Sequence, residues 1–212
     1  MSHTGLGARA AVLAAAVLAA TPAAAGGNMN GGRLVGDTQG YVDFGFPWLD
    51  GGVRLRIEHG AFELRPHVRL SYADDLDLGV FAFTPALGFR LPVRGVAHGG
   101  AAITLDVPVQ FGLAGASGRV GVRVGLGHPG FAVSLHADKA VDIDLGLRLE
   151  NDLTVYPDVA FRGALPVLVG AEGDLGGVRL GGRIEGGPVI ASSGSGWQVS
   201  GTVRALMSVG IP

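Results

Sequence analysis

The chain has 212 residues, of which 48% are hydrophobic and 38 are Gly, and its formal net charge is −2. This charge balance predicts no nucleic-acid partner. The absence of Cys excludes disulfides, thiolate metal sites and lipidation through Cys. Because Gly is a poor helix former, its abundance indicates turns, strands and tight packing. No internal run approaches the roughly 20 apolar residues that a membrane helix needs.

The N-terminal segment 1–25 has the pattern of a cleaved secretory signal peptide. Arg9 supplies positive charge, 10–20 is a short apolar run, and three Ala residues at 23–25 offer a small-residue cleavage site. The apolar run is too short for a membrane anchor. We therefore expect export, with the exported chain beginning at Gly26.

The remaining chain is predicted to hold a lead-in over 26–40 and a single β-domain over 41–212. In the clearest stretch, 101–113, every odd position is apolar, and the even positions from Thr104 onward are polar, Pro or Gly. Such period-two alternation is typical of a strand with one apolar face. Pro108 lacks an N–H group, so it predicts a bulge or a local break in pairing.

The same alternation recurs along the whole domain, and the connections between its segments are short. We expect antiparallel up-and-down strands, about 12 in number, or 10 or 8 if weak strands merge. The predicted strands are 41–46, 53–58, 62–72, 76–90, 101–113, 120–126, 131–137, 141–150, 153–161, 165–171, 178–189 and 197–211.

Several connections need separate interpretation. The segment 47–52 is predicted to be a turn, and so is Asn151-Asp152. At 125–130 the spacing GxGxxG occurs, but this fingerprint binds nucleotides only between a strand and a helix. Because a strand follows here, a hairpin turn is predicted. The segment 162–164 is either a tight turn or part of one long bent strand, since the alternation keeps its phase.

The polar face of these strands mixes opposite charges, and all but one of the 16 basic residues are Arg. Arg is suited to fixed, bidentate pairing with carboxylates in confined spaces. These side chains are predicted to line a lumen: Arg54, Arg56, Glu58, Glu63, Arg65, Arg69, Asp106, Arg123, Asp142, Asp144, Arg148, Glu150, Asp158, Arg162, Arg179, Arg183, Glu185 and Arg204.

Two folds fit an alternating pattern: a transmembrane β-barrel and a soluble β-sandwich. The barrel is favoured because no charge falls on the apolar face of the predicted strands. A charge facing lipid costs about 2–4 kcal/mol at mid-bilayer, which would enforce such a separation. A set of aromatic residues is also predicted to lie on the outside near one rim, as in an interfacial belt: Trp48, Tyr72, Phe111, Phe161 and Trp197.

On this pattern, residues 41–211 resemble the outer-membrane β-barrel proteins of Gram-negative bacteria, in the broad porin-like sense. The resemblance implies an all-β, antiparallel transmembrane barrel in the cell outer membrane, with the lipid bilayer as its partner. The chain departs from the group in ending on Ile211-Pro212 rather than on an aromatic residue, and in its short loops. The first departure bears on the insertion route, and the second weakens a role as an adhesin or receptor.

No catalytic or metal-binding constellation is found. His67 and Ser71 share a strand face but lie roughly 13 Å apart by strand rise, so they cannot act as base and nucleophile. The six His are scattered, and the Asp74–Asp77 cluster lacks EF-hand spacing. We expect no enzymatic activity and no cofactor. The function predicted is a structural or passive narrow-pore barrel, with small solutes or ions as its cargo. The alternative is a soluble secreted or periplasmic sandwich that binds a ligand or partner.

Overall fold

The computed structural model describes residues 31–35, 38–57, 62–72, 81–93, 99–114, 119–137, 141–193 and 196–211. Regular structure within these ranges consists of β-strands, and every pairing is antiparallel. In the same ranges no helix is long and apolar enough to cross a membrane. The strands are β1 (Thr38–Phe46), β2 (Trp48–Ile57), β3 (Phe62–Ser71), β4 (Phe81–Pro92), β5 (Gly99–Ala114), β6 (Arg119–Gly125), β7 (His128–His136), β8 (Val141–Arg148), β9 (Glu150–Tyr156), β10 (Ala160–Ala164), β11 (Val167–Leu175), β12 (Val178–Ser193) and β13 (Gly196–Ile211).

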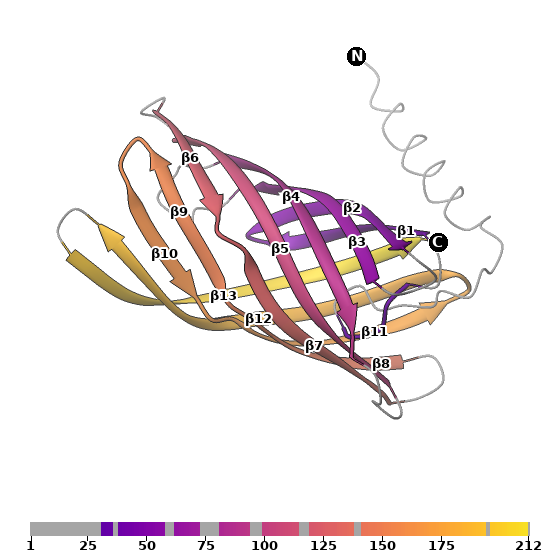
Figure 1. The fold of residues 1–212 in the computed structure, drawn as a ribbon. Coiled ribbons are helices and arrows are strands. Elements are labelled where there is room, and N and C mark those ends of the chain that lie inside the picture. Colours follow the sequence, from indigo (N-terminus) through magenta and orange to yellow (C-terminus); the bar gives the residue numbers. More distant parts are fainter. Residues whose placement is uncertain are drawn as a thin grey trace, which may run out of the picture.

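These 13 strands form one sheet that closes on itself (Figure 1). Hydrogen bonds run through a ring of 10 strands, in the order β1-β2-β3-β4-β5-β7-β8-β11-β12-β13 and back to β1. A second path, from β5 through β6, β9 and β10 to β12, closes the sheet around the remaining part. The predicted all-β, up-and-down barrel is therefore confirmed.

In three places the chain crosses the barrel wall once as two collinear strands with a short interruption between them. These pairs are β6–β7, β8–β9 and β10–β11. β6 and β7 both run antiparallel to β5, through the partners Val109↔Val124 and Asp106↔His128. In the same way, β8–β9 and β10–β11 pair along one continuous register, from Ala164↔Glu150 to Val167↔Leu147. The two halves of each pass point in the same direction.

These interruptions correct two predicted turns. The hairpin predicted at 125–130 is wrong, because the chain continues in the same direction from β6 to β7. The turn predicted at Asn151-Asp152 is also wrong, because both residues lie within β9 and the reversal falls at 157–159. The bent-strand interpretation of 162–164 is confirmed, because β10 leads straight into β11. Residues 48–52 likewise belong to β2 rather than to a turn.

Proline residues lie at or beside the interruptions. Pro108 lies where β5 stops pairing with β7 and starts pairing with β6, which confirms the predicted break. Pro166 separates β10 from β11. Because Pro has no N–H group, it cannot donate to the ladder on either side. Neighbouring strands use proline carbonyls instead: Leu149 N donates to Pro129 O (2.8 Å), and Leu165 N donates to Pro188 O (3.1 Å).

The barrel has two different ends, which we call the near end and the far end. The near end, at the right in Figure 1, holds the start of β1 and the end of β13. The far end holds the turn 46–48 and the β12–β13 hairpin. Because β1 pairs with β13 only from Ala205 to Ile211, the first part of β13 extends past β1 at the far end.

Side chains of opposite polarity occupy the two faces of the barrel wall. Large apolar residues such as Ile143 and Leu145 are exposed on the outside, whereas Asp142 and Asp144, which alternate with them, are buried on the inside. Along the described strands, the outward positions hold no charged side chain. The interior of the barrel is therefore its polar part.

All five aromatic residues of the predicted belt lie at the far end, but one of them faces the interior. Phe111 and Trp197 are exposed on the outside, and the Trp197 ring packs edge-on against Phe161 at 6.3 Å between centroids. Trp48 instead is 3% exposed and faces the interior. It does so because the turn at Pro47 changes which positions face outward, from even residues in β1 to odd residues in β2.

Candidate functional site: the charged interior of the barrel

The interior face brings together most of the charged residues singled out in the sequence. Inside the ring, or at its rim, lie Arg54, Arg56, Glu63, Arg65, Arg69, Asp106, Arg123, Asp142, Asp144, Arg148, Glu150, Arg162, Arg179, Arg183, Glu185 and Arg204. Asp158 does not join them, because it lies exposed in the turn between β9 and β10. Glu58 lies outside the described residues.

Several residues line the interior although the sequence did not predict them to do so. They are Asp43, Asp50, His67, Arg90, His128, Asp152 and Glu172. Asp50, His128 and Asp152 were assigned to turns but lie in strands of the structure. Strand parity alone would have found Asp43, His67 and Arg90, and Glu172 follows the inward phase of β11 one residue beyond the predicted strand 165–171.

Glycine at inward positions makes room for the long charged side chains. A Cβ atom at Gly88 would lie 2.3 Å from Asp106 Oδ1, and one at Gly181 would lie 2.8 Å from Glu172 Cγ. The abundance of Gly, which indicates strands and tight packing in the sequence, thus allows Arg and Glu to fill a narrow barrel.

Glu150 on β9 is the centre of the largest ion-pair group. Its Oε1 accepts hydrogen bonds from Arg204 (2.6 Å) and Arg148 (2.8 Å). Its Oε2 accepts from Arg204 (2.8 Å) and Arg162 (3.2 Å). These arginines come from β13, β8 and β10, so one buried carboxylate joins four strands. Removing one partner of a buried pair costs about 3–5 kcal/mol, because the other charge then lacks compensation.

The group continues from Glu150 along the wall to Glu185 on β12. Arg148 also donates to Glu185 Oε2 (2.9 Å), and Arg183 Nε donates to Glu185 Oε1 (2.8 Å). Arg183 NH1 then reaches Asp43 on β1 (2.9 Å). These ion pairs therefore link strands that are not hydrogen-bonded neighbours, such as β8 with β12 and β12 with β1.

A second group surrounds Trp48 at the far end. The guanidinium groups of Arg69 and Arg204 lie over the indole ring, at 4.0 and 4.6 Å from its centroid. Arg69 Nε donates to Asp50 Oδ2 (3.1 Å), and His67 Nδ1 lies 3.0 Å from the same oxygen. Trp48 thus connects this group to the Glu150 group through Arg204, by cation–π contacts that are worth about 0.5–2 kcal/mol each.

The segment 31–35 lies inside the barrel at the near end, and we call it the strap. Gly32 N donates to Ser134 Oγ on β7 (2.7 Å), and Arg33 donates to Asp142 on β8 (3.0 Å). On the other side, Val35 N donates to Glu63 Oε2 on β3 (3.0 Å). In the ring order, β7 and β8 are separated from β2 and β3 by two strands on one side and four on the other. The strap therefore crosses the interior.

Close packing accompanies these bonds. A Cβ atom at Gly32 would lie 2.4 Å from Gly100 O, so a larger residue does not fit against the wall. Val35 is 2% exposed. Arg54 and Arg56 on β2 donate to the strap carbonyls of Arg33 (3.4 Å) and Val35 (3.1 Å). The predicted lead-in 26–40 thus includes a segment held inside the domain that follows it.

Acidic side chains gather on the wall beneath the strap. Asp142 binds Arg33 and Arg179 and also contacts His136. Arg179 Nε donates to Glu172 Oε2 (2.9 Å). Because Arg33 and Arg179 share one carboxylate, the strap belongs to the same network as the wall.

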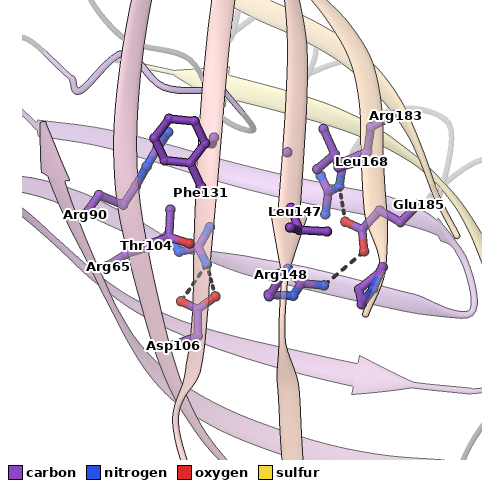
Figure 2. Close-up of a pocket in the computed structure, with 13 residues that line it drawn as sticks. Arg65, Arg90, Thr104, Asp106, Phe131, Leu147, Arg148, Leu168, Arg183 and Glu185 are labelled. Carbon is purple, nitrogen blue, oxygen red and sulfur yellow. Dashed lines mark hydrogen bonds and ion pairs between the residues drawn. The ribbon is translucent and has the colours of Figure 1, made fainter. Parts of the chain in front are cut away.

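Between these groups lie small cavities of about 60, 40 and 10 Å³. The largest, which we call the central cavity, is bordered by Arg65 and Asp106 on one side and by Arg148, Arg183 and Glu185 on the other (Figure 2). The smallest cavity shares Arg148 with the central cavity and His128 with the 40 Å³ cavity, so the three lie in a row. On this measure one water needs about 10–15 Å³, so the two larger cavities have room for a few waters.

The described residues include no cluster of three or more His, Asp or Glu side chains able to hold a metal ion. His67 and Ser71 stay unrelated in the structure, because the His67 ring is bound to Asp50. No family model matches the chain, and a search of curated proteins finds no match. The function is therefore inferred from the arrangement of side chains in the barrel.

Proposed function

We propose that this protein is an integral outer-membrane β-barrel with a structural role, closed inside by its ion pairs and by the strap. The observation that carries the proposal is the reversed distribution of side chains, with exposed apolar residues outside and buried charges inside. In water this distribution exposes much apolar surface, whereas in a bilayer it places that surface against lipid tails. The apolar segment 1–25 supports export to that membrane.

The localisation can be tested by expressing the full chain in a Gram-negative host and fractionating the cells. We expect the protein in the outer-membrane fraction, extractable only with detergent. Its mobility on a gel should also depend on heating, because a barrel that stays folded in cold detergent migrates differently from an unfolded chain. Release by osmotic shock as a soluble protein would contradict the proposal and favour the soluble exported alternative.

A passive narrow pore is the second candidate, and the row of polar cavities favours it. A pore of this kind would conduct through polar side chains that move aside for small ions. Planar-bilayer recordings separate the two roles. The closed barrel predicts no steady conductance for the wild-type protein, and the pore predicts a small, steady one.

The strap provides a variant for the same recordings. Gly32→Val cannot keep its position against Gly100 and should displace the strap, which removes one barrier at the near end. We expect conductance to rise in this variant and to stay at the wild-type level in Thr38→Ala, which changes an exposed residue at the start of β1. Equal conductance of Gly32→Val and Thr38→Ala would show that the strap does not close the barrel.

A further inference from the structure

Positive charge exceeds negative charge around the central cavity. Four arginines, Arg65, Arg90, Arg148 and Arg183, line it together with two carboxylates, Asp106 and Glu185. They come from several strands of the ring and converge on one space (Figure 2). Buried charges are normally matched by opposite charges, so the local ratio needs an explanation.

The two carboxylates are already occupied by arginines. Both oxygens of Asp106 accept from Arg65 NH2, at 2.8 and 2.9 Å. Glu185 accepts from Arg183 at Oε1 and from Arg148 at Oε2. Neither carboxylate is therefore left to neutralise further positive charge in the cavity.

Carboxylates just behind the cavity offset this positive charge only in part: Asp43 accepts from Arg183 NH1 (2.9 Å), but the others are each shared by several arginines. Glu63 lies 2.7 Å from Arg54 and 3.5 Å from Arg90. Glu150 is shared by Arg148, Arg162 and Arg204. These shared carboxylates therefore leave the arginines that line the cavity in excess over the carboxylates that line it.

The cavity wall also offers a donor that the protein does not use. The Nε atom of Arg65 is buried and makes no hydrogen bond, while NH2 of the same guanidinium binds Asp106. Thr104 adds a hydroxyl group to the lining. Guanidinium groups match the oxygens of tetrahedral oxyanions in a bidentate geometry, and such charge-assisted bonds are about twice as strong as neutral ones.

We propose that the central cavity binds one small inorganic oxyanion of the sulfate or phosphate type. The volume of about 60 Å³ is that of a site for a small ion rather than for an organic solute. The bound anion would supply the missing negative charge between the two walls and connect Arg65 and Arg90 to Arg148 and Arg183. This site goes beyond the proposed structural role and does not depend on the membrane.

The proposal can be tested on the purified, folded full-length protein in a neutral detergent. The midpoint of thermal unfolding is measured while sodium sulfate is titrated, with sodium gluconate at equal ionic strength as an anion too large for the cavity. We expect sulfate up to about 10 mM to raise the midpoint by about 3–5 °C, saturably, and gluconate to change it by less than about 1 °C. Equal effects of the two salts would overturn the proposal.

Arg90→Gln removes one guanidinium from the cavity, and Glu63 keeps its bonds to Arg54. We expect this variant to need at least about tenfold more sulfate for the same shift. Arg90→Lys keeps a positive charge without the planar donor pair, so the sulfate concentration it needs should lie between those of the wild type and Arg90→Gln. The control is Arg123→Gln, which changes a buried Arg at the 40 Å³ cavity and should respond like the wild-type protein. Wild-type sulfate dependence in both Arg90 variants would overturn the assignment.

The outcomes separate this inference from the proposed function. A protein found in the soluble fraction would remove the membrane role, and the sulfate titration would still decide whether the cavity binds an anion. Conversely, a membrane-inserted barrel without a saturable sulfate effect would keep its proposed role and lose the anion site.

Discussion

The outer and inner faces of the barrel differ in polarity, burial and the way they pack. On β8, the side chain of Leu145 is 41% exposed, whereas that of the preceding Asp144 is fully buried. The outer side chains are largely exposed, whereas inner carboxylates such as Glu150 and Glu185 bind two or three arginines each. In most soluble proteins the large apolar side chains are the buried ones. In this barrel it is the charged side chains that are buried, and the position of each depends on the neighbours that bind it.

Because of this difference, the two faces should tolerate different kinds of substitution. The inner face should accept little change of charge or volume, since each group is bound on several sides. The outer face should accept any apolar residue and reject charge only if it faces lipid. Four substitutions test this difference, ordered by the size of the expected effect.

Glu150→Gln should cause the largest loss. Three arginines would then face a neutral amide in place of a carboxylate, and the free energy of unfolding should fall by about 3–5 kcal/mol. Urea unfolding in detergent, followed by tryptophan fluorescence, measures the change. Asp158→Asn, at the exposed turn after β9, is the control and should stay within about 0.5 kcal/mol of the wild type. Similar losses for the two would show that burial of Glu150 does not matter.

Leu145→Arg places a charge on the outer face, in the middle of β8. Facing lipid, it should cost about 2–4 kcal/mol in a bilayer and reduce insertion into vesicles. Leu145→Ala controls for the loss of the side chain. If Leu145→Arg inserted as well as Leu145→Ala, this face would not contact lipid. At the exposed surface of a soluble protein, the same change usually stays within about 0.5 kcal/mol.

Gly88→Ala and Gly51→Ala compare the same change on the two faces. A Cβ atom at Gly88 would meet Asp106 Oδ1 at 2.3 Å, whereas one at Gly51 has no neighbour closer than 3.6 Å. Overpacking should cost Gly88→Ala about 1–3 kcal/mol in urea unfolding. Gly51→Ala should be close to neutral. A neutral Gly88→Ala would mean that the Arg65–Asp106 pair can move aside.

Trp48→Leu should have the smallest effect of the three inner changes considered. It removes the ring under Arg69 and Arg204, and cation–π contacts are worth about 0.5–2 kcal/mol each. Trp197→Leu, on the outside at the far end, is the matched control and should change stability less. The midpoint of thermal unfolding, monitored by gel mobility, is compared for the two variants. A lower midpoint for Trp197→Leu than for Trp48→Leu would contradict an interior role for Trp48.

Strand parity predicted most of the interior correctly in position, because a strand turns successive side chains to opposite faces. Arg54, Asp106 and Arg183 could be placed on the polar face without knowing their partners. Trp48 and Asp50 could not, because the reversal at Pro47 begins β2 earlier than the pattern suggests. Asp158 was misplaced for the opposite reason, since its phase continues that of β9 although the strand ends at Tyr156.

The alternating sequence alone determined that the chain forms strands with one apolar and one charged face, because period two is a local property of the backbone. The short connections between the strands determined their antiparallel order. Ring closure, the collinear joins β6–β7, β8–β9 and β10–β11, and the choice of partners for each Arg depend on strands far apart in sequence. The same holds for the strap, whose donors and acceptors come from β2, β3, β7 and β8. Only the closed sheet brings these groups within hydrogen-bonding distance, and with them the central cavity and its excess of arginine.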